Sequence, residues 1–235
     1  HPLVYLGFST GKEVKALRRL ESAQNINLDL PPVRLRRLRE AKLLIQESLD
    51  RFTLAHQRQI WVEKTPRHFI HAHRIQSSIS NMIVVHIIRN GQDVVASIVD
   101  RARSFPDRFP RQLNYRYGLS VWNQAILKHL ECLGVTGHVF VVYEELVKNP
   151  KTVLQSLCEK IGTSYEPNML SEDLDSGAFI KSDEQWKFGA TSKIRSPQNK
   201  FPHLFDRKEK NKINRQLNWT GYRRLHLGVN SFKND

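Results

Sequence analysis

Three polar residues near the middle of the sequence could together bind an anion. Arg89 follows the largely apolar residues 82–88, and Ser97 and Arg101 come later in the same segment. An arginine beside the first turn of a helix can hold a phosphate, because the N–H groups and the dipole of the helix add to the guanidinium charge. The alternative is a structural arginine that pairs with a nearby carboxylate such as Asp93.

The elements that must position these residues can be predicted from the apolar pattern. Residues 82–88 are short and rich in Val and Ile, which is typical of a strand buried on both faces of a parallel sheet. Asn90 and Gly91 end this strand, and from Gln92 the apolar residues fall on one face of a helix: Val94, Val95, Ile98 and Val99. Arg89 therefore stands at the carboxyl end of a strand, where open α/β sheets bind ligands. Ser97 and Arg101 share a face of the helix.

This segment resembles the 3′-phosphate-binding motif of sulfotransferases that use 3′-phosphoadenosine 5′-phosphosulfate (PAPS). The pattern of its residues is most similar to that of the protein-tyrosine and bacterial branch. The resemblance implies that Arg89 and Ser97 hold the 3′-phosphate of the nucleotide and that Arg101 joins them. It also implies a three-layer α/β/α fold with a parallel central sheet, similar to that of the P-loop nucleoside triphosphatases (NTPases).

A lysine upstream matches a second feature of this family. Residues 59–62, QIWV, predict a short strand, and Pro66 suits the first turn of a helix over residues 68–80. Lys64-Thr65-Pro66 resembles the family's Lys-[Ser/Thr/Asp]-Pro triplet, which implies that Lys64 reaches the bridging oxygen or the sulfonate. A cation there stabilises the charge that builds on the leaving phosphate oxygen. The alternative is a surface lysine near a turn.

A third match follows residues 138–142, HVFVV, which predict another buried strand. The next residues, YEEL, precede a helix that begins near Pro150 and ends at Gly162. This block resembles the family's Tyr-Glu-[Asp/Glu]-Leu element, which implies that Tyr143 lies near the adenine or its phosphate. We expect Glu144 and Glu145 to have structural roles.

The family's phosphosulfate loop, of the type Gly/Pro-Arg-Ser-Gly-Thr-Thr, does not occur in this sequence. In the family, the helix after that loop commonly ends in a His-Pro pair, and this sequence begins with His1-Pro2. We therefore expect the first strand and the phosphate loop to be missing. Residues 1–235 are expected to form a single sulfotransferase domain that is incomplete at its N-terminus.

Composition limits the partners. A chain of 235 residues can bury one sizeable core, and its net charge of +14 favours anionic partners. Cys132 and Cys158 form neither a disulfide framework nor a zinc spacing and are expected to be buried structural residues. Three histidines lie close together in the sequence: His68, His71 and His73. No carboxylate or cysteine completes a metal-binding spacing with them, so no metal is expected. No apolar run is long enough to span a membrane, and we expect a bacterial cytoplasm, with the Golgi lumen as the alternative.

The resemblance predicts an enzyme that moves a sulfuryl group from PAPS to a hydroxyl or amine of a small molecule, glycan or protein side chain. One alternative is a nucleotide kinase, but it requires a Walker-type lysine and a magnesium-binding carboxylate, which the sequence lacks. Another is a basic protein that binds RNA or a polyanion without catalysis. Such a protein needs aromatic residues on a basic face, whereas the aromatic residues here fall mostly in apolar stripes, so no nucleic-acid partner is expected.

Overall fold

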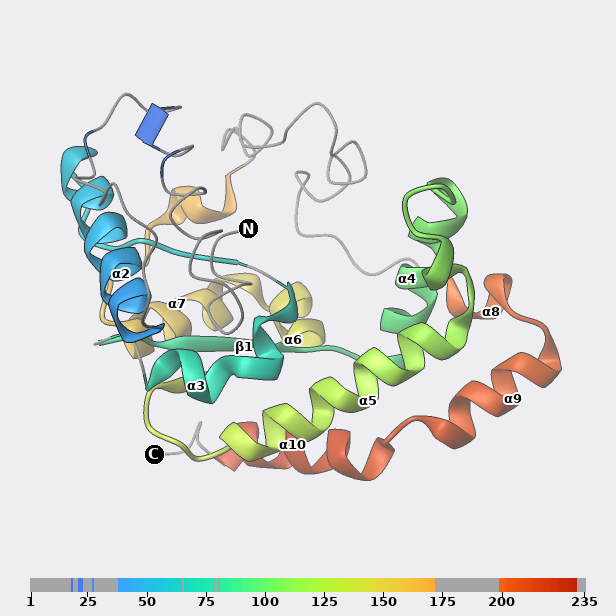
Figure 1. Cartoon of the computed structure of the whole chain (residues 1–235). Helices are drawn as coiled ribbons and strands as arrows, with labels where there is room; N and C mark the ends of the chain where they lie inside the picture. The colour runs from blue at the N-terminus through green and yellow to red at the C-terminus, as the bar shows by residue number, and fades with distance from the viewer. Residues whose placement is uncertain are drawn as a thin grey trace. The chain divides into compact units, whose positions relative to one another are not determined.

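The structure is a computed structural model that describes residues 18, 21, 22, 27, 38–64, 66–77, 79, 81–171 and 199–231 (Figure 1). Within these ranges the side chains of residues 38–45, 66, 67, 230 and 231 are not described. The chain divides into two compact units, residues 1–84 and 85–235, which we describe separately. The expectation of a single domain stays a prediction.

The first unit contains helices in its described part. Helix α2 spans Leu38–Ala55, the 3-10 helix η2 spans Pro66–His71, and helix α3 spans Ala72–Gln76. The predicted strand over residues 59–62 is wrong, because this segment is irregular and the side chain of Val62 is 88% exposed. A strand needs a neighbour with which to form backbone hydrogen bonds, and the two strands in the described part of the chain pair with each other.

The second unit begins with a crossover between two parallel strands. Strand β1 (Val84–Ile88) leads into α4 (Gly91–Ser104), η3 (Pro110–Leu113) and α5 (Tyr115–Cys132), and the chain then enters β2 (His138–Val142). Strands β1 and β2 are paired in one sheet, and parallel strands need such a long connection, usually a helical one. The predicted α/β class is therefore confirmed.

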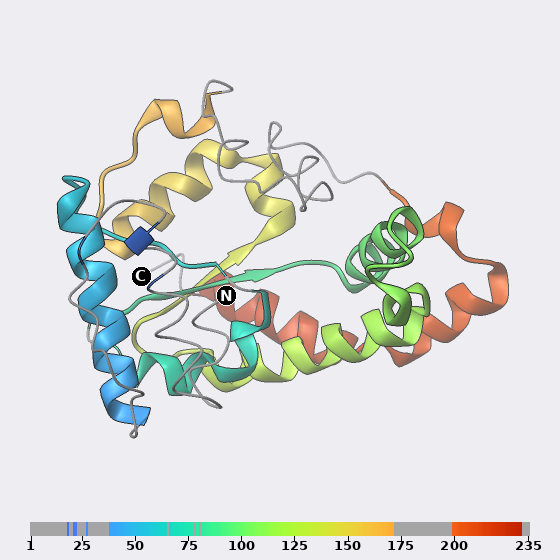
Figure 2. The same cartoon turned by 45° about the horizontal axis from the view of Figure 1, so that its top comes forward.

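The rest of this unit is helical: α6 (Tyr143–Lys148), α7 (Pro150–Ile161), η4 (Pro167–Leu170), α8 (Phe201–Leu204), α9 (Arg207–Gln216) and α10 (Trp219–Ser231). In Figure 2, α5 and α10 lie on one side of the strands, and α6 and α7 lie on the other. Both α10 and α7 contact β2. The strands thus lie between two layers of helices, as the predicted three-layer fold requires.

The core of the second unit lies on the side of α4, α5 and α10. The buried cluster includes Ile88 of β1, Val95 of α4, Ile126 of α5 and Leu225 of α10. The other face of β1 is more open, and the side chain of Ile87 is 58% exposed. The prediction that β1 is buried on both faces is therefore wrong for the described residues. Its side chains alternate between inside and outside instead, which is typical of a strand covered on one face, while the helices of the second layer, α6 and α7, pack on β2.

The turn between β1 and α4 is held by one cap and one close contact. The side chain of Asn90 caps α4, because its Oδ1 accepts a hydrogen bond of 2.9 Å from the backbone N–H of Gln92. A Cβ at Gly91 would lie 2.6 Å from Cδ2 of Leu217 and 2.9 Å from Cε2 of Trp122. Only glycine therefore fits at the first residue of α4 without moving these side chains.

Candidate functional site

Arg89 and Tyr143 meet where the two parallel strands end. Arg89 follows the last residue of β1, and Tyr143 follows the last residue of β2 and begins α6. The guanidinium carbon of Arg89 lies 4.4 Å from the centroid of the Tyr143 ring. This distance is that of a cation–π contact. The structure thus brings together two residues that the sequence analysis assigned to nucleotide binding.

The nitrogens of Arg89 are weakly engaged. The Nη2 of Arg89 lies 3.9 Å from Oδ2 of Asp93, which is long for a charge-assisted hydrogen bond. The Nε of Arg89 is buried and has no hydrogen-bond partner among the described residues. Pairing with Asp93, the structural alternative from the sequence, is therefore present but loose. One face of the guanidinium packs on Tyr143, and its edge retains the capacity to donate to an anion.

Glu144 holds this turn in place. Its Oε1 accepts a hydrogen bond of 2.8 Å from the backbone N–H of Asn90, the residue after Arg89. Its charge also acts on Asp93, whose pKa is raised mainly by burial and further by Glu144, against the lowering effect of Arg89. The structural role expected for Glu144 is confirmed, and this contact positions the backbone next to Arg89.

Ser97 and Arg101 lie on α4, beyond the turn. Ser97 is exposed. The Nη2 of Arg101 donates a hydrogen bond of 2.8 Å to Oε1 of Gln112, and its guanidinium carbon lies 4.9 Å from the ring centroid of Phe109. Burial lowers the pKa of Arg101, although an arginine stays protonated at neutral pH. Like Arg89, Arg101 packs on an aromatic ring and has a buried Nε with no hydrogen-bond partner among the described residues. Unlike Arg89, it donates a short hydrogen bond to a neutral side chain.

The sequence analysis missed Gln112 and Phe109 as neighbours of Arg101. Both belong to the connection between α4 and α5, which the sequence does not distinguish from an ordinary loop. A signal was available, because polar and aromatic residues in a loop beside a candidate ligand site often contribute to it. The phosphate-binding roles of Ser97 and Arg101 stay predictions.

Lys64 belongs to the first unit, in the irregular segment before η2, and its side chain is exposed. Its neighbour Glu63 pairs with His68, with 2.7 Å between Oε2 and Nδ1. The role of Lys64 at the leaving oxygen stays a prediction. His1-Pro2 lies outside the described residues, so the expectation of a missing phosphate loop also stays a prediction.

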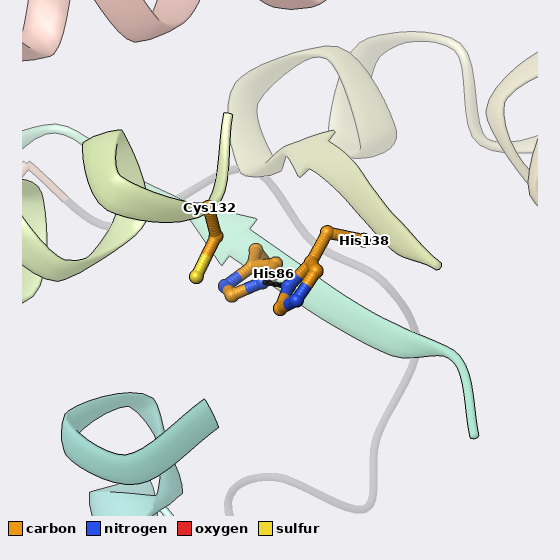
Figure 3. A group of neighbouring side chains, drawn as sticks. All are labelled: His86, Cys132 and His138. Atoms are coloured by element: carbon orange, nitrogen blue, oxygen red, sulfur yellow. Dashed lines mark hydrogen bonds between the residues drawn. The ribbon is translucent and has the colours of Figure 1, made fainter. Parts of the chain in front are cut away.

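A second polar cluster lies inside the second unit (Figure 3). Nδ1 of His86 lies 2.9 Å from Nδ1 of His129, and Nε2 of His86 lies 2.7 Å from Nδ1 of His138. Burial lowers the pKa of His86 to about 3, with a further contribution from His129 and His138, and lowers that of His129 to about 4. Cys132 lies beside these rings, and His86, Cys132 and His138 could hold a metal ion.

Comparisons with known proteins agree with this fold. Residues 6–167 match the model of the sulfotransferase family. The sulfotransferase domain from the curacin biosynthetic pathway has a TM-score of 0.56 at 16% identity, covering 84% of this chain and 78% of that domain. The sulfotransferase domain from the Synechococcus PCC 7002 olefin synthase has a TM-score of 0.50 at 16% identity, covering 85% of this chain and 76% of that domain. Among curated proteins, none matches this sequence.

At such low identity the two solved structures show similarity of fold alone. The match to the family model is different, because it extends over more than half of the sequence. It includes the strand ends that carry Arg89 and Tyr143. The chain therefore belongs to the sulfotransferase family.

Proposed function

We propose that this chain transfers a sulfuryl group from PAPS to a hydroxyl or amine acceptor, and that the Arg89–Tyr143 pair binds the nucleotide. The observation that carries the proposal is the guanidinium of Arg89, packed on Tyr143 at the carboxyl edge of the sheet, with an Nε that has no partner among the described residues. Membership of the sulfotransferase family supports the reaction class. The carboxyl edge of a parallel sheet is also where α/β folds bind nucleotides.

Each proposed binding residue has a distinct role. The edge of the Arg89 guanidinium donates to the oxygens of the 3′-phosphate, while Tyr143 supports its face and borders the adenine. The hydroxyl of Ser97 and the guanidinium of Arg101 supply further donors from α4. The strong positive charge of the whole chain favours the approach of this anionic nucleotide.

The proposed reaction is an in-line displacement at sulfur. A bond forms between sulfur and the acceptor oxygen or nitrogen, the bond between sulfur and the 5′-phosphate oxygen breaks, and the acceptor proton leaves. The electron pair of the broken bond stays with the phosphate, so that 3′-phosphoadenosine 5′-phosphate is released. Lys64 is the cation proposed to stabilise the charge on this leaving oxygen.

The acceptor is proposed only as a class: a small molecule, a glycan or a protein side chain that bears a hydroxyl or an amine. No helix in the described part of the chain is long and apolar enough to cross a membrane. A bacterial cytoplasm as the site of action stays a prediction from the sequence.

Calorimetric titration with three nucleotides tests the proposal. We expect 3′-phosphoadenosine 5′-phosphate to bind at least about tenfold more tightly than 5′-AMP, because a hydrogen bond to a charged group contributes about 1.5–3 kcal/mol. Adenosine 2′,5′-bisphosphate is the matched control, since it has the same charge with the phosphate on the neighbouring oxygen. Equal affinity for all three nucleotides, or no binding of any, would contradict the proposal.

A further inference from the structure

We propose that His86, Cys132 and His138 form a binding site for a Zn²⁺ ion inside the second unit. The three residues come from β1, the last turn of α5 and the first residue of β2. One ligand atom from each residue, a ring nitrogen or the sulfur, lies within 4.8 Å of the other two. Figure 3 shows the two rings and the thiol gathered in one place. Imidazole and thiolate are the ligands that Zn²⁺ prefers in proteins.

The two histidines already present converging nitrogens. Nε2 of His86 and Nδ1 of His138 are 2.7 Å apart. Bonds of about 2.0–2.1 Å at tetrahedral angles place two ligand nitrogens about 3.3 Å apart, so the rings must separate by about 0.6 Å to admit the ion. His138 is only half-buried and begins its strand, which gives its ring room to move and gives the ion a route of entry.

A fourth residue orients the His86 ring. Nδ1 of His129 lies 2.9 Å from Nδ1 of His86, on the opposite side of that ring from His138. Histidines that bind metals usually donate their second ring N–H to a nearby acceptor, which fixes the tautomer. Here the acceptor is the Nδ1 lone pair of His129. His86 then keeps its proton on Nδ1 and offers the lone pair of Nε2 to the ion.

The protons balance when the ion binds. Cys132 loses its thiol proton to solvent, and His138 keeps one proton, on Nε2, while Nδ1 binds the metal. Burial and the charge of Glu131 raise the pKa of the Cys132 thiol, and the divalent charge must overcome both effects. Three protein ligands leave one coordination position for water or a further ligand.

Without a metal, the three imidazoles would form a chain of hydrogen bonds between uncharged rings, and Cys132 would be an ordinary buried thiol. The test must therefore report on the sulfur. Cys158 is a matched control, because it is also a free, buried cysteine, and its neighbour is the sulfur of Met169 at 3.9 Å. The proposal departs from the expectation, drawn from the sequence, that no metal is bound.

The ion would join both strands to α5, at the end of β2 opposite to Tyr143. His138 is the first residue of β2, whereas Tyr143 follows its last residue. This position separates the ion from the proposed transfer reaction, and we expect it to stabilise the fold by joining three elements even though one coordination position stays open. Because the site lies apart from the Arg89–Tyr143 pair, the proposal stands or falls independently of the proposed function.

The experiment is a titration of the purified, metal-free chain with Co²⁺, a spectroscopic substitute for Zn²⁺. A thiolate ligand produces a charge-transfer band in the near ultraviolet. We expect this band to saturate at one equivalent of Co²⁺ and to disappear on addition of Zn²⁺. Cys132→Ser should abolish the band, and Cys158→Ser should retain it. Zn²⁺ should also raise the melting temperature of the wild-type chain.

A second pair of variants protects the test against a misfolded Cys132→Ser protein. His138→Gln, at a half-buried position, should weaken Zn²⁺ binding by more than tenfold, since loss of a mere outer-shell partner costs about 10–100-fold. His203→Gln, at an exposed position on α8, should leave the affinity unchanged. Absence of the band in the wild-type chain, or its persistence in Cys132→Ser, would overturn the proposal. Equal Zn²⁺ affinity of His138→Gln and the wild type would do the same.

Discussion

At the scale of single residues, the candidate nucleotide site depends on how one guanidinium divides its contacts. Arg89 places its face over Tyr143, and the distance between its Nη2 and Oδ2 of Asp93 is 3.9 Å. A face packed on an aromatic ring is held in orientation while the N–H groups at its edge stay available. This arrangement supports the proposed role of Arg89 in binding an anion.

The ring of Tyr143 should matter more than its hydroxyl. Tyr143→Ala removes the cation–π contact, which is worth about 0.5–2 kcal/mol, and should weaken binding of 3′-phosphoadenosine 5′-phosphate by about 2–30-fold. Tyr143→Phe keeps the ring and should bind within about twofold of the wild type, as measured by calorimetry. If both variants lose affinity equally, the hydroxyl is the important group and the role given to the ring is wrong.

Glu144 should contribute to stability through its hydrogen bond with the backbone N–H of Asn90. Glu144→Ala leaves this partly buried donor without its acceptor and should lower the free energy of unfolding by about 1–3 kcal/mol in urea denaturation. Glu159→Ala, at an exposed position on α7, is the control and should change it by less than about 0.5 kcal/mol. Equal stabilities of the two variants would show that the contact does not hold the turn.

At the scale of elements, the sequence predicts best where local signals and packing agree. Strand β2 was predicted at the residues where it occurs, because a β-branched run between a glycine and a helix start is unambiguous. Helix α7 was also predicted close to its observed ends, because Pro150 suits its first turn and Gly162 ends it in the left-handed conformation. The prediction of a strand over residues 59–62 was wrong because the short, mostly apolar segment QIWV does not show whether a neighbouring strand is available for pairing.

The candidate sites show the same contrast. Arg89 and Tyr143 could be predicted as neighbours, because the carboxyl ends of parallel strands lie at one edge of a sheet. The cluster around His86 could not be predicted, since its members are distant in sequence and each lies within an apolar pattern. The sequence instead suggested His68, His71 and His73 as possible metal ligands, because they lie close together along the chain. Of these, His68 pairs with Glu63.

The start of α4 provides a test at this scale. A Cβ at Gly91 would meet Leu217 and Trp122 at 2.6 and 2.9 Å, so Gly91→Ala should lower the free energy of unfolding by about 1–3 kcal/mol through overpacking. Gly162→Ala is the comparison, because this glycine has a φ of 75° and no atom within 4 Å of the added Cβ. It should cost about 1–2 kcal/mol through its backbone alone.

Nucleotide binding separates these two variants. Gly91→Ala should also weaken binding of 3′-phosphoadenosine 5′-phosphate, since Trp122 donates a hydrogen bond of 2.9 Å to the carbonyl oxygen of Arg89. Gly162→Ala should leave this affinity unchanged. If Gly91→Ala is as stable as the wild type in urea denaturation, the packing at the start of α4 is looser than the structure indicates.

At the scale of the whole molecule, the net charge of +14 should speed the capture of an anionic nucleotide. Raising the salt concentration from about 0.1 M to about 1 M shortens the screening length from about 10 Å to about 3 Å. The association rate constant of 3′-phosphoadenosine 5′-phosphate should then fall several-fold in stopped-flow fluorescence, with a smaller change in dissociation. Adenosine, which is uncharged, is the control. An association rate constant that does not change with salt concentration would contradict this role of the charge.

The most direct test of the central claim combines the 3′-phosphate with Arg89 in one cycle. The affinities of 3′-phosphoadenosine 5′-phosphate and 5′-AMP are measured by calorimetry for the wild type, for Arg89→Ala and for Arg116→Ala, a control at an exposed position on α5. If Arg89 holds the 3′-phosphate, the wild type and Arg116→Ala should bind 3′-phosphoadenosine 5′-phosphate at least about tenfold more tightly than 5′-AMP. In Arg89→Ala this preference should fall below about threefold. A preference that survives in Arg89→Ala, or an equal loss of affinity for both nucleotides, would contradict it.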